Sequence, residues 1–263
     1  MEHISWSVDP VLFSLGSIRI HWYGVLFACG FILGFLFMKR VYLGEGKNVE
    51  DLDRLLYYIM GGTIIGARLG HCLFYDPVFY LNNPLKILAI WEGGLASHGG
   101  GLGVLIALYL YLRKTGDCYL WLLDRLVIPT AMVAFFIRLG NFFNSEIVGR
   151  SADVPWAIVF ERLDGVARHP AQLYEALSYL TIFFALWFLF RKTKAAARYG
   201  LISGIFLILV FTARFFIEFV KTKQAAYSSD LWLSTGQLLS IPFVVAGVVL
   251  MILAMRRQQE KKG

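Results

Sequence analysis

One short stretch of the chain, residues 138–149, carries a guanidinium, two side-chain amides and a carboxylate at the end of an apolar segment. These groups belong to Arg138, Asn141, Asn144 and Glu146. A charged side chain in lipid is costly, and it is usually retained because it has a function. A guanidinium donates two parallel hydrogen bonds to a phosphate, and nearby amides add donors. The residue types therefore predict a phosphate site at the edge of a membrane.

The alternative for this stretch is an interfacial cap in which Arg138 extends to water. Steps of three residues from Arg138 to Asn141 and on to Asn144 keep these side chains near one another if the segment is helical. Glu146 is placed to orient the arginine or the amides. Because four polar groups gather here, we favour the site over the cap.

A second candidate segment, residues 91–103, holds six glycines in thirteen positions around His98. Irregular backbone at membrane depth is tolerated only against protein or a water-filled cavity, and Glu92 lies nearby in the chain. The segment therefore predicts a functional cavity. The alternative is close helix packing through small residues, with His98 as a hydrogen-bonded side chain.

Two later segments carry polar groups inside apolar surroundings. Pro170 is suited to the first turn of a helix, and Gln172 and Glu175 follow one turn deeper, where an interfacial role explains them poorly. Arg214 and Glu218 are four residues apart and share a helical face, which fits a structural ion pair as well as a functional site.

Other polar residues have simpler explanations. Arg68 has no acid near it in sequence, so it needs a partner from another helix or a ligand, whereas Asp124 and Arg125 are expected to be structural. No HExxH motif or acidic metal cluster occurs in the sequence. The segment around Ser203 resembles that of a membrane serine protease only faintly. All five histidines precede Ser203, so a catalytic base would have to come from elsewhere. We set that class aside.

The elements that must position these groups are transmembrane helices. The 263 residues are 58% hydrophobic and 16% charged, whereas a soluble domain is about 25% charged. About 20 helical residues cross a hydrocarbon core of about 30 Å. We predict an all-α integral membrane protein with one membrane domain over 1–263, an N-terminal interfacial arm (1–21) and a small external cap (139–170). The predicted spans are 22–38, 55–75, 94–112, 119–137, 171–190, 200–217 and 236–255.

The net charge of +7 is distributed unevenly between the two sides of these spans. Fourteen of the 25 Lys and Arg residues fall on one side, eight on the other and three within spans. The positive-inside rule then places the N-terminus outside and the C-terminus in the cytoplasm. The basic excess thus reflects topology, and we expect no nucleic-acid partner.

Two further expectations concern the first apolar run and the cysteines. The first run is expected to remain as a span, because its positive charges follow it instead of preceding it. Cys29, Cys72 and Cys118 lack CxxC spacing, and two of them lie in apolar runs. We expect free, buried thiols and no disulfide.

Seven blocks, in order along nearly the whole chain, resemble the bacterial prolipoprotein diacylglyceryl transferase family. They are His21–Gly24, Gly66–Gly70, Gly93–Gly100, Arg138–Gly149, Arg168–Glu175, Arg214–Phe219 and Gly236–Pro242. The fourth block is similar to the family's signature, with one departure. The family usually has glycine before the arginine, where this chain has Ile137.

The resemblance implies transfer of a diacylglyceryl group from phosphatidylglycerol to the lipobox cysteine of a preprolipoprotein, the first step of lipoprotein maturation. It also implies release of glycerol phosphate, a bacterial plasma (inner) membrane location, a lipobox peptide and the lipid bilayer as partners, and no metal or cofactor. Carried over from the family, Arg138 and Arg214 would hold the phosphate and His98 would be the candidate base. The other site residues implied are Asn141, Asn144 and Glu146, which would orient the headgroup, with Tyr23, Glu175 and Glu218 in support.

Several alternatives remain open at this point. Tyr23 or a substrate oxygen could take the thiol proton in place of His98, whose unperturbed pKa of about 6.5 suits a base. A lipid-binding transporter or scavenging channel could use the same arginines without chemistry. A structural membrane subunit would tolerate Arg138→Lys, because a point charge would then suffice.

Overall fold

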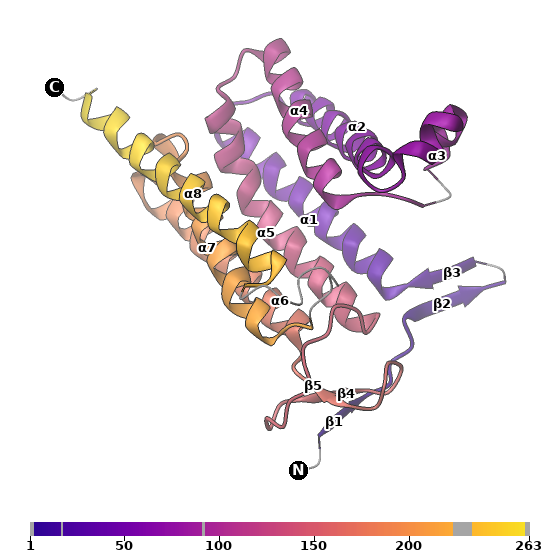
Figure 1. The fold of residues 1–263 in the computed structure, drawn as a ribbon. Helices are drawn as coiled ribbons and strands as arrows, with labels where there is room; N and C mark the ends of the chain where they lie inside the picture. The colour runs from indigo at the N-terminus through magenta and orange to yellow at the C-terminus, as the bar shows by residue number, and fades with distance from the viewer. Residues whose placement is uncertain (1–2, 17, 91–92, 223–232, 261–263) are drawn as a thin grey trace. The chain divides into compact units, whose positions relative to one another are not determined.

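The computed structural model describes residues 3–16, 18–90, 93–222 and 233–260 (Figure 1). Within these ranges, seven long helices coincide with the seven predicted spans. They are α1 (Trp22–Gly44), α2 (Val49–Phe74), α4 (Ser97–Thr115), α5 (Tyr119–Phe143), α6 (Ala171–Lys192), α7 (Leu201–Ile217) and α8 (Thr235–Glu260). The shorter elements are α3 (Pro77–Asn82) and the 3₁₀ turns η1 (Pro84–Leu88), η3 (Lys194–Ala197) and η4 (Glu218–Val220).

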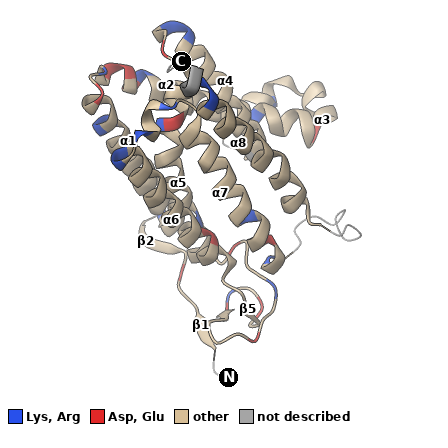
Figure 2. Ribbon diagram, turned by 90° about the vertical axis from the view of Figure 1, so that its left-hand side faces the viewer, with Lys and Arg blue, Asp and Glu red and all other residues tan. Residues whose placement is uncertain are grey.

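Five of these helices, α1, α5, α6, α7 and α8, are long and apolar enough to cross a membrane. In Figure 2 the central turns of α7 and α8 are free of charged residues, which lie toward the helix ends. The prediction of an all-α, multi-pass membrane protein is therefore confirmed, whereas the count of seven spans is not. In α2 the polar side chains of Arg68 and His71 lower the hydropathy, and in α4 those of His98, Arg113 and Lys114 do so.

The residues divide into two compact units. The first unit comprises residues 1–38 and 123–263, and the second comprises residues 39–122. In the first unit, α5, α6 and α7 enclose an apolar core that includes Ile128, Leu186 and Ile202. The prediction of one membrane domain stays a prediction.

Helices α7 and α8 pack closely in the first unit (Figure 1). The rings of Phe211 and Phe243 stack with their centroids 4.3 Å apart. Gly204 and Gly247 face each other so closely that a Cβ built on either would lie 2.7 Å from the carbonyl oxygen of the other. Small residues let backbones approach in this way in membrane helices.

Asp124 is structural, as predicted. Its buried carboxylate accepts hydrogen bonds from the backbone nitrogens of Gly200 (2.7 Å) and Ser203 (2.8 Å), and from the Ser203 hydroxyl (2.6 Å). The carboxylate therefore satisfies free N–H groups at the start of α7, where negative charge is favourable. The Ser203 hydroxyl donates to this cap, which agrees with setting the protease class aside.

The N-terminal arm and the predicted cap share one small sheet. Strand β1 (Ile4–Trp6) pairs in parallel with β4 (Ile158–Phe160), which pairs antiparallel with β5 (Ala167–Arg168). Strands β2 (Val11–Leu15) and β3 (Ile18–His21) form a separate antiparallel pair. Phe142 at the end of α5 packs beneath β4, against Ile158 and Phe160. The cap is thereby anchored to the helix that carries the signature stretch.

We predict that one turn of the cap loosens in acid. The Arg168 guanidinium donates to the Asp164 carboxylate and holds the pKa of that carboxyl below its usual range. An unfolded Asp binds its proton near pH 3.9, so the stabilisation is full above about pH 4 and is lost as pH falls through the lower folded-state pKa. Protection of the 163–168 turn from hydrogen exchange, relative to the intrinsic rate at each pH, should fall below about pH 4 in the parent chain. Asp164→Asn should remove this pH dependence, whereas Glu161→Gln should retain it.

The second unit is built on close packing of α2 against α4. A Cβ on Gly66 would lie 2.7 Å from the Gly103 Cα and would also overlap the Gly99 carbonyl oxygen. A Cβ on Gly70 would lie 2.8 Å from the Gly99 Cα. These glycines therefore serve the small-residue packing that was the alternative interpretation of the 91–103 segment.

Gly66→Ala is predicted to destabilise this helix pair. The added Cβ meets backbone, which cannot rotate away, so the helices must separate; overpacking of this kind costs about 1–3 kcal/mol. Gly61→Ala is the matched control, because a Cβ at Gly61 on the same helix meets nothing within 4 Å. Detergent-based unfolding should show a loss for Gly66→Ala alone. Equal stability of the two variants would contradict the packing assignment.

Arg68 finds its partners in the backbone of the segment that joins α2 to α4. Its guanidinium donates to the carbonyl oxygens of Ile87 (2.8 Å), Gly93 (2.5 Å), Gly94 (3.1 Å) and Lys86 (2.5 Å). Both glycines have positive φ, 86° and 71°. Arg68 is buried and holds this connection in shape, so the need for a partner is met without a ligand.

All three cysteines are free, as predicted. Only Cys72 is buried, whereas Cys29 and Cys118 are exposed on the protein surface, so the prediction of burial was wrong for those two.

Candidate functional site

Three chain segments of the first unit bring the predicted polar residues together. These are the end of α5 with the loop that follows it, the start of α6, and the end of α7 with η4. The signature stretch begins on the last turns of α5, so its arginine and first amide are placed by a helix.

Arg138 is held by two partners through different nitrogens. Its Nη1 donates to the Asn141 Oδ1 at 3.1 Å, and its Nε lies 3.0 Å from the Glu175 Oε2. Glu175 is only 1% exposed, so this ion pair is shielded from water. Two of the five N–H groups of the guanidinium are thus oriented by protein, which fixes where its remaining donors point.

Glu146 joins both amides of the signature. Its Oε2 accepts from the Asn141 Nδ2 and its Oε1 from the Asn144 Nδ2, each at 3.1 Å. The buried Gln172 on α6 donates to the Glu146 carbonyl oxygen at 2.6 Å. The four groups predicted from sequence therefore form one connected network, in which Glu146 orients the amides.

The loop after α5 holds a strained backbone. Ser145 and Ile147 have φ values of 56° and 58°, a region that β-branched residues such as isoleucine rarely enter. Such conformations persist where the surroundings over-determine them, often at functional sites. Gly149 ends the loop, and a Cβ there would lie 2.5 Å from the His169 carbonyl oxygen and 2.8 Å from that of Val220. The close approach requires glycine.

Lys221 belongs to this site and was not predicted from sequence. Its Nζ lies 3.4 Å from the Glu175 Oε1 and 3.8 Å from the Glu218 Oε2, and its side chain is 8% exposed. A β-bridge between Gly149 and Lys221 positions it against the signature loop. The available signal was its spacing of three residues from Glu218, with which it shares a face of the helix end.

Of the two interpretations left open for Arg214 and Glu218, the structure shows no ion pair between them among the described residues. Glu218 instead faces Lys221, and a Cβ on Gly236 would lie 2.6–2.7 Å from the Glu218 carboxyl group. The Arg214 Nε is buried and has no hydrogen-bond acceptor among the described residues. A buried donor without an acceptor is costly in a protein and calls for an explanation.

Tyr179 on α6 is buried beside these residues. Its side chain is within electrostatic range of Glu175, Arg138 and Arg214. The sequence offered no signal for this tyrosine, since it lies within an apolar run of α6.

Tyr23 and His98 differ in how the structure places them. Tyr23 is at the start of α1 in the first unit, within electrostatic reach of Glu146 and Arg138, and its ring lies 2.7 Å from where a Cβ on Gly140 would be. His98 lies in the first turn of α4, in the second unit, with an exposed side chain. It therefore belongs to a different unit from the other predicted site residues. Glu92, named beside it, lies outside the described residues.

The charged groups of the first-unit site balance. We call the following six residues the charged cluster: Arg138, Arg214, Lys221, Glu146, Glu175 and Glu218. Three cations and three carboxylates make it formally neutral, so the cations are stabilised without a bound anion. Arg214 nevertheless retains an unused donor, which gives the cluster the means to bind a phosphate.

A family model described as prolipoprotein diacylglyceryl transferase matches residues 10–253. Among similar proteins, three from Tolumonas auensis, Chloroherpeton thalassium and Porphyromonas gingivalis are named phosphatidylglycerol–prolipoprotein diacylglyceryl transferase. They are 56%, 49% and 48% identical to this chain, over 96%, 99% and 98% of it and 98%, 98% and 97% of their own lengths. The chain belongs to the prolipoprotein diacylglyceryl transferase family.

Proposed function

We propose that the charged cluster binds the phosphate of phosphatidylglycerol and stabilises it as it leaves. The reaction follows from membership of the family. The chain is a transferase that moves the diacylglyceryl group of phosphatidylglycerol to the thiol of a preprolipoprotein's lipobox cysteine and releases glycerol phosphate. The bilayer and these two substrates are its partners.

The bonds that change define what the site must do. The cysteine sulfur forms a bond to a glyceryl carbon, the C–O bond from that carbon to phosphate breaks, and the thiol proton is released. The thiol has an unperturbed pKa of about 8.5 and reacts as a thiolate. The departing phosphate gains negative charge as the bond breaks. Cations aimed at that charge stabilise the transition state more than the bound substrate.

The observation that carries the proposal is the buried Nε donor of Arg214, which has no hydrogen-bond acceptor among the described residues. A phosphate between these two arginines would accept that donor and the free edge of Arg138. Asn141 and Asn144 would orient the glycerol headgroup, and Tyr23 would contact it from α1.

Glu175, Glu218 and Lys221 act through the arginines. The Glu175 carboxylate forms ion pairs with both Arg138 and Lys221. Because Lys221 shares this negative charge, Glu175 attracts Arg138 less strongly, and the guanidinium is freer to bind a phosphate. We therefore assign Glu175 and Lys221 as positioning residues. The Glu218 carboxyl group packs directly against Gly236, where any side chain would displace it.

His98 is proposed as the base that takes the thiol proton. His98→Gln keeps a hydrogen-bonding amide but cannot accept a proton, and loss of a general base costs about 100-fold or more. We expect His98→Gln and His98→Asn to lower kcat about 100-fold. Full activity in His98→Gln would remove it as the base and leave Tyr23 or a substrate oxygen.

We also propose that the chain forms one membrane domain in the plasma membrane, with its N-terminus outside, its cap (139–170) external and its C-terminus in the cytoplasm. This orientation follows from the distribution of Lys and Arg, and it puts Arg138 at the face where exported preproteins present their cysteine. Labelling of single cysteines placed at Asp164 and at Arg198 with an impermeant reagent tests it. If only the cysteine at position 198 were labelled, the chain would have the opposite orientation.

The transfer reaction is tested directly with purified protein, phosphatidylglycerol and a lipobox peptide. We expect a peptide that gains a thioether-linked diacylglyceryl group, detected by mass spectrometry. The same peptide with cysteine replaced by serine is the control. Retention of phosphatidylglycerol without any modified peptide would favour a lipid-binding transporter or channel.

A further inference from the structure

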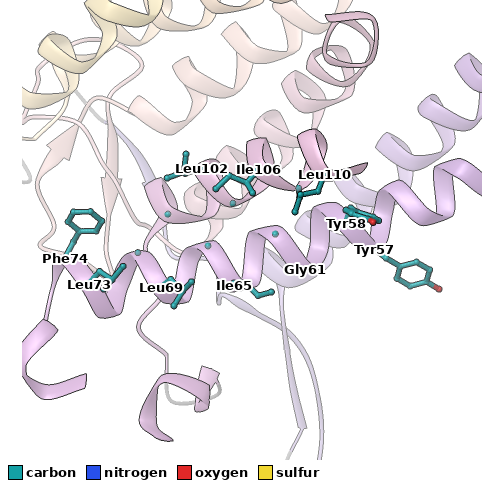
Figure 3. A pocket seen from close by; sticks show the side chains of 16 residues that line it. Tyr57, Tyr58, Gly61, Ile65, Leu69, Leu73, Phe74, Leu102, Ile106 and Leu110 are labelled. Atoms are coloured by element: carbon teal, nitrogen blue, oxygen red, sulfur yellow. The ribbon is translucent and has the colours of Figure 1, made fainter. Parts of the chain in front are cut away.

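A groove separate from the charged cluster runs along α2 and α4 within the second unit (Figure 3). Its cavity volume is about 740 Å³, within the range of about 300–1,000 Å³ found for small-molecule sites. Glycines of both helices form its floor, because their packing leaves no side chains there. Its walls are aliphatic and include Ile65, Leu69, Leu102 and Ile106, each more than two-fifths exposed.

One end of the groove carries aromatic hydroxyls and cations. Tyr57 and Tyr58 line this end (Figure 3), and the Lys114 Nζ lies 5.8 Å from the centre of the Tyr58 ring. Arg113 donates to the Tyr109 hydroxyl at 3.3 Å. Both cations are exposed, and neither forms an ion pair within the part of the chain that the structure describes. Tyrosines with a basic residue typify headgroup depth in a membrane.

At the opposite end the lining residues are apolar. Leu73 and Phe74 line it, and both are exposed. From Tyr58 to Phe74 the groove follows α2 for about 24 Å at 1.5 Å per residue, most of a hydrocarbon core of about 30 Å. The groove is therefore amphipathic along its length, with a cationic end and an apolar channel.

We propose that this groove binds one anionic phospholipid, with its phosphate beside Lys114 and an acyl chain along the glycine floor. The aliphatic walls exclude water from the acyl chain. The ammonium group of Lys114 supplies the positive charge that pairs with an anionic headgroup. In the orientation proposed above, the cationic end faces the cytoplasm, on the side opposite Arg138. The bound lipid is thus not the reacting one, and its binding does not require catalysis.

Charge decides between a lipid and a second copy of the chain in this groove. A two-fold dimer uses the same patch on both subunits, and a membrane two-fold axis runs along the bilayer normal. The basic ends of two grooves would then meet, bringing Arg113 and Lys114 of each copy together. Like charges repel in that arrangement, whereas an anionic phospholipid neutralises them.

Native mass spectrometry of the delipidated full chain in detergent tests the proposal, with phosphatidylglycerol and phosphatidylcholine as probes. We expect one phosphatidylglycerol to be retained that phosphatidylcholine does not replace. Lys114→Gln should weaken it about fivefold, the effect of about one interfacial charge, and Ile106→Trp should displace it by filling the groove. The matched controls are Lys39→Gln on α1 and Leu105→Trp, an exposed α4 position outside the groove.

The binding is measured again in an Arg138→Gln chain, which separates this lipid from one in the charged cluster. A lipid that persists in Arg138→Gln and is lost in Ile106→Trp supports the proposal. Equal retention of the two lipids, or retention unaffected by both Lys114→Gln and Ile106→Trp, overturns it. If the parent chain were dimeric and Ile106→Trp made it monomeric, the groove would bind a second copy of the chain instead of a lipid.

Discussion

Arg138→Lys is expected to lower kcat/KM for diacylglyceryl transfer at least about 100-fold, and Arg138→Ala about 1,000-fold, the range seen when one donor to a developing anion is lost. Lysine keeps the charge, but one ammonium cannot pair with Glu175 and Asn141 and also offer a free edge to phosphate. The assay is transfer to a lipobox peptide at saturating and limiting phosphatidylglycerol.

The matched control is Arg162→Lys, an exposed arginine of the cap whose Nη1 lies 3.6 Å from the Asp9 Oδ1. Its activity should change little, because an exposed pair contributes little and lies apart from the charged cluster. If Arg138→Lys were as active as Arg162→Lys, a point charge would suffice at position 138. Bidentate hydrogen bonding of Arg138 to the phosphate would then be excluded, and a structural role for Arg138 would remain.

Glu175→Gln is expected to lower the free energy of unfolding by about 3–5 kcal/mol, because it leaves two buried cations without their shared countercharge. Arg138 and Lys221 lie 3.0 Å and 3.4 Å from its two oxygens. Activity should fall as well, since Arg138 loses its orientation. Unfolding in mixed detergent, followed by tryptophan fluorescence, measures the stability, with the exposed Glu161→Gln as control.

The double variant Glu175→Gln with Lys221→Met separates positioning from a general loss of structure. It removes one cation together with the carboxylate, so its loss of stability should be smaller than the sum of the two single losses. Lys221→Arg should retain most activity, because it keeps the charge beside Glu175 and Glu218. Additive losses would mean that Glu175 and Lys221 do not interact, which would contradict the shared ion pair.

The helices were predictable because long apolar runs admit few alternatives in a membrane. All seven predicted spans fall on helices, and the signature network of Arg138, Asn141, Asn144 and Glu146 forms as its spacing indicated. The glycine segment was harder, since the same composition fits a cavity or close packing. Only the position of the α2 glycines opposite Gly99 and Gly103 distinguishes them.

The parts that sequence could not give depend on contacts between distant segments. In the sequence, Lys221 is one more basic residue near a helix end. Only the structure shows that its Nζ lies 3.4 Å from the Glu175 Oε1 on α6. Arg214 and Glu218 have the spacing of an ion pair, yet Glu218 faces Lys221 instead. Local spacing defines which groups can meet, and tertiary packing decides which of them do.

The parallel pairing of β1 with β4 has a consequence for the order in which the chain can be made and assembled. Ile4 pairs with Ile158, so strand β1 must wait for a partner that is synthesised some 150 positions later. Contacts of such long sequence separation form late, because the intervening loop must close first. The arm therefore closes over the cap only after α5 has been inserted, and a bulky fusion at the N-terminus would delay that final step.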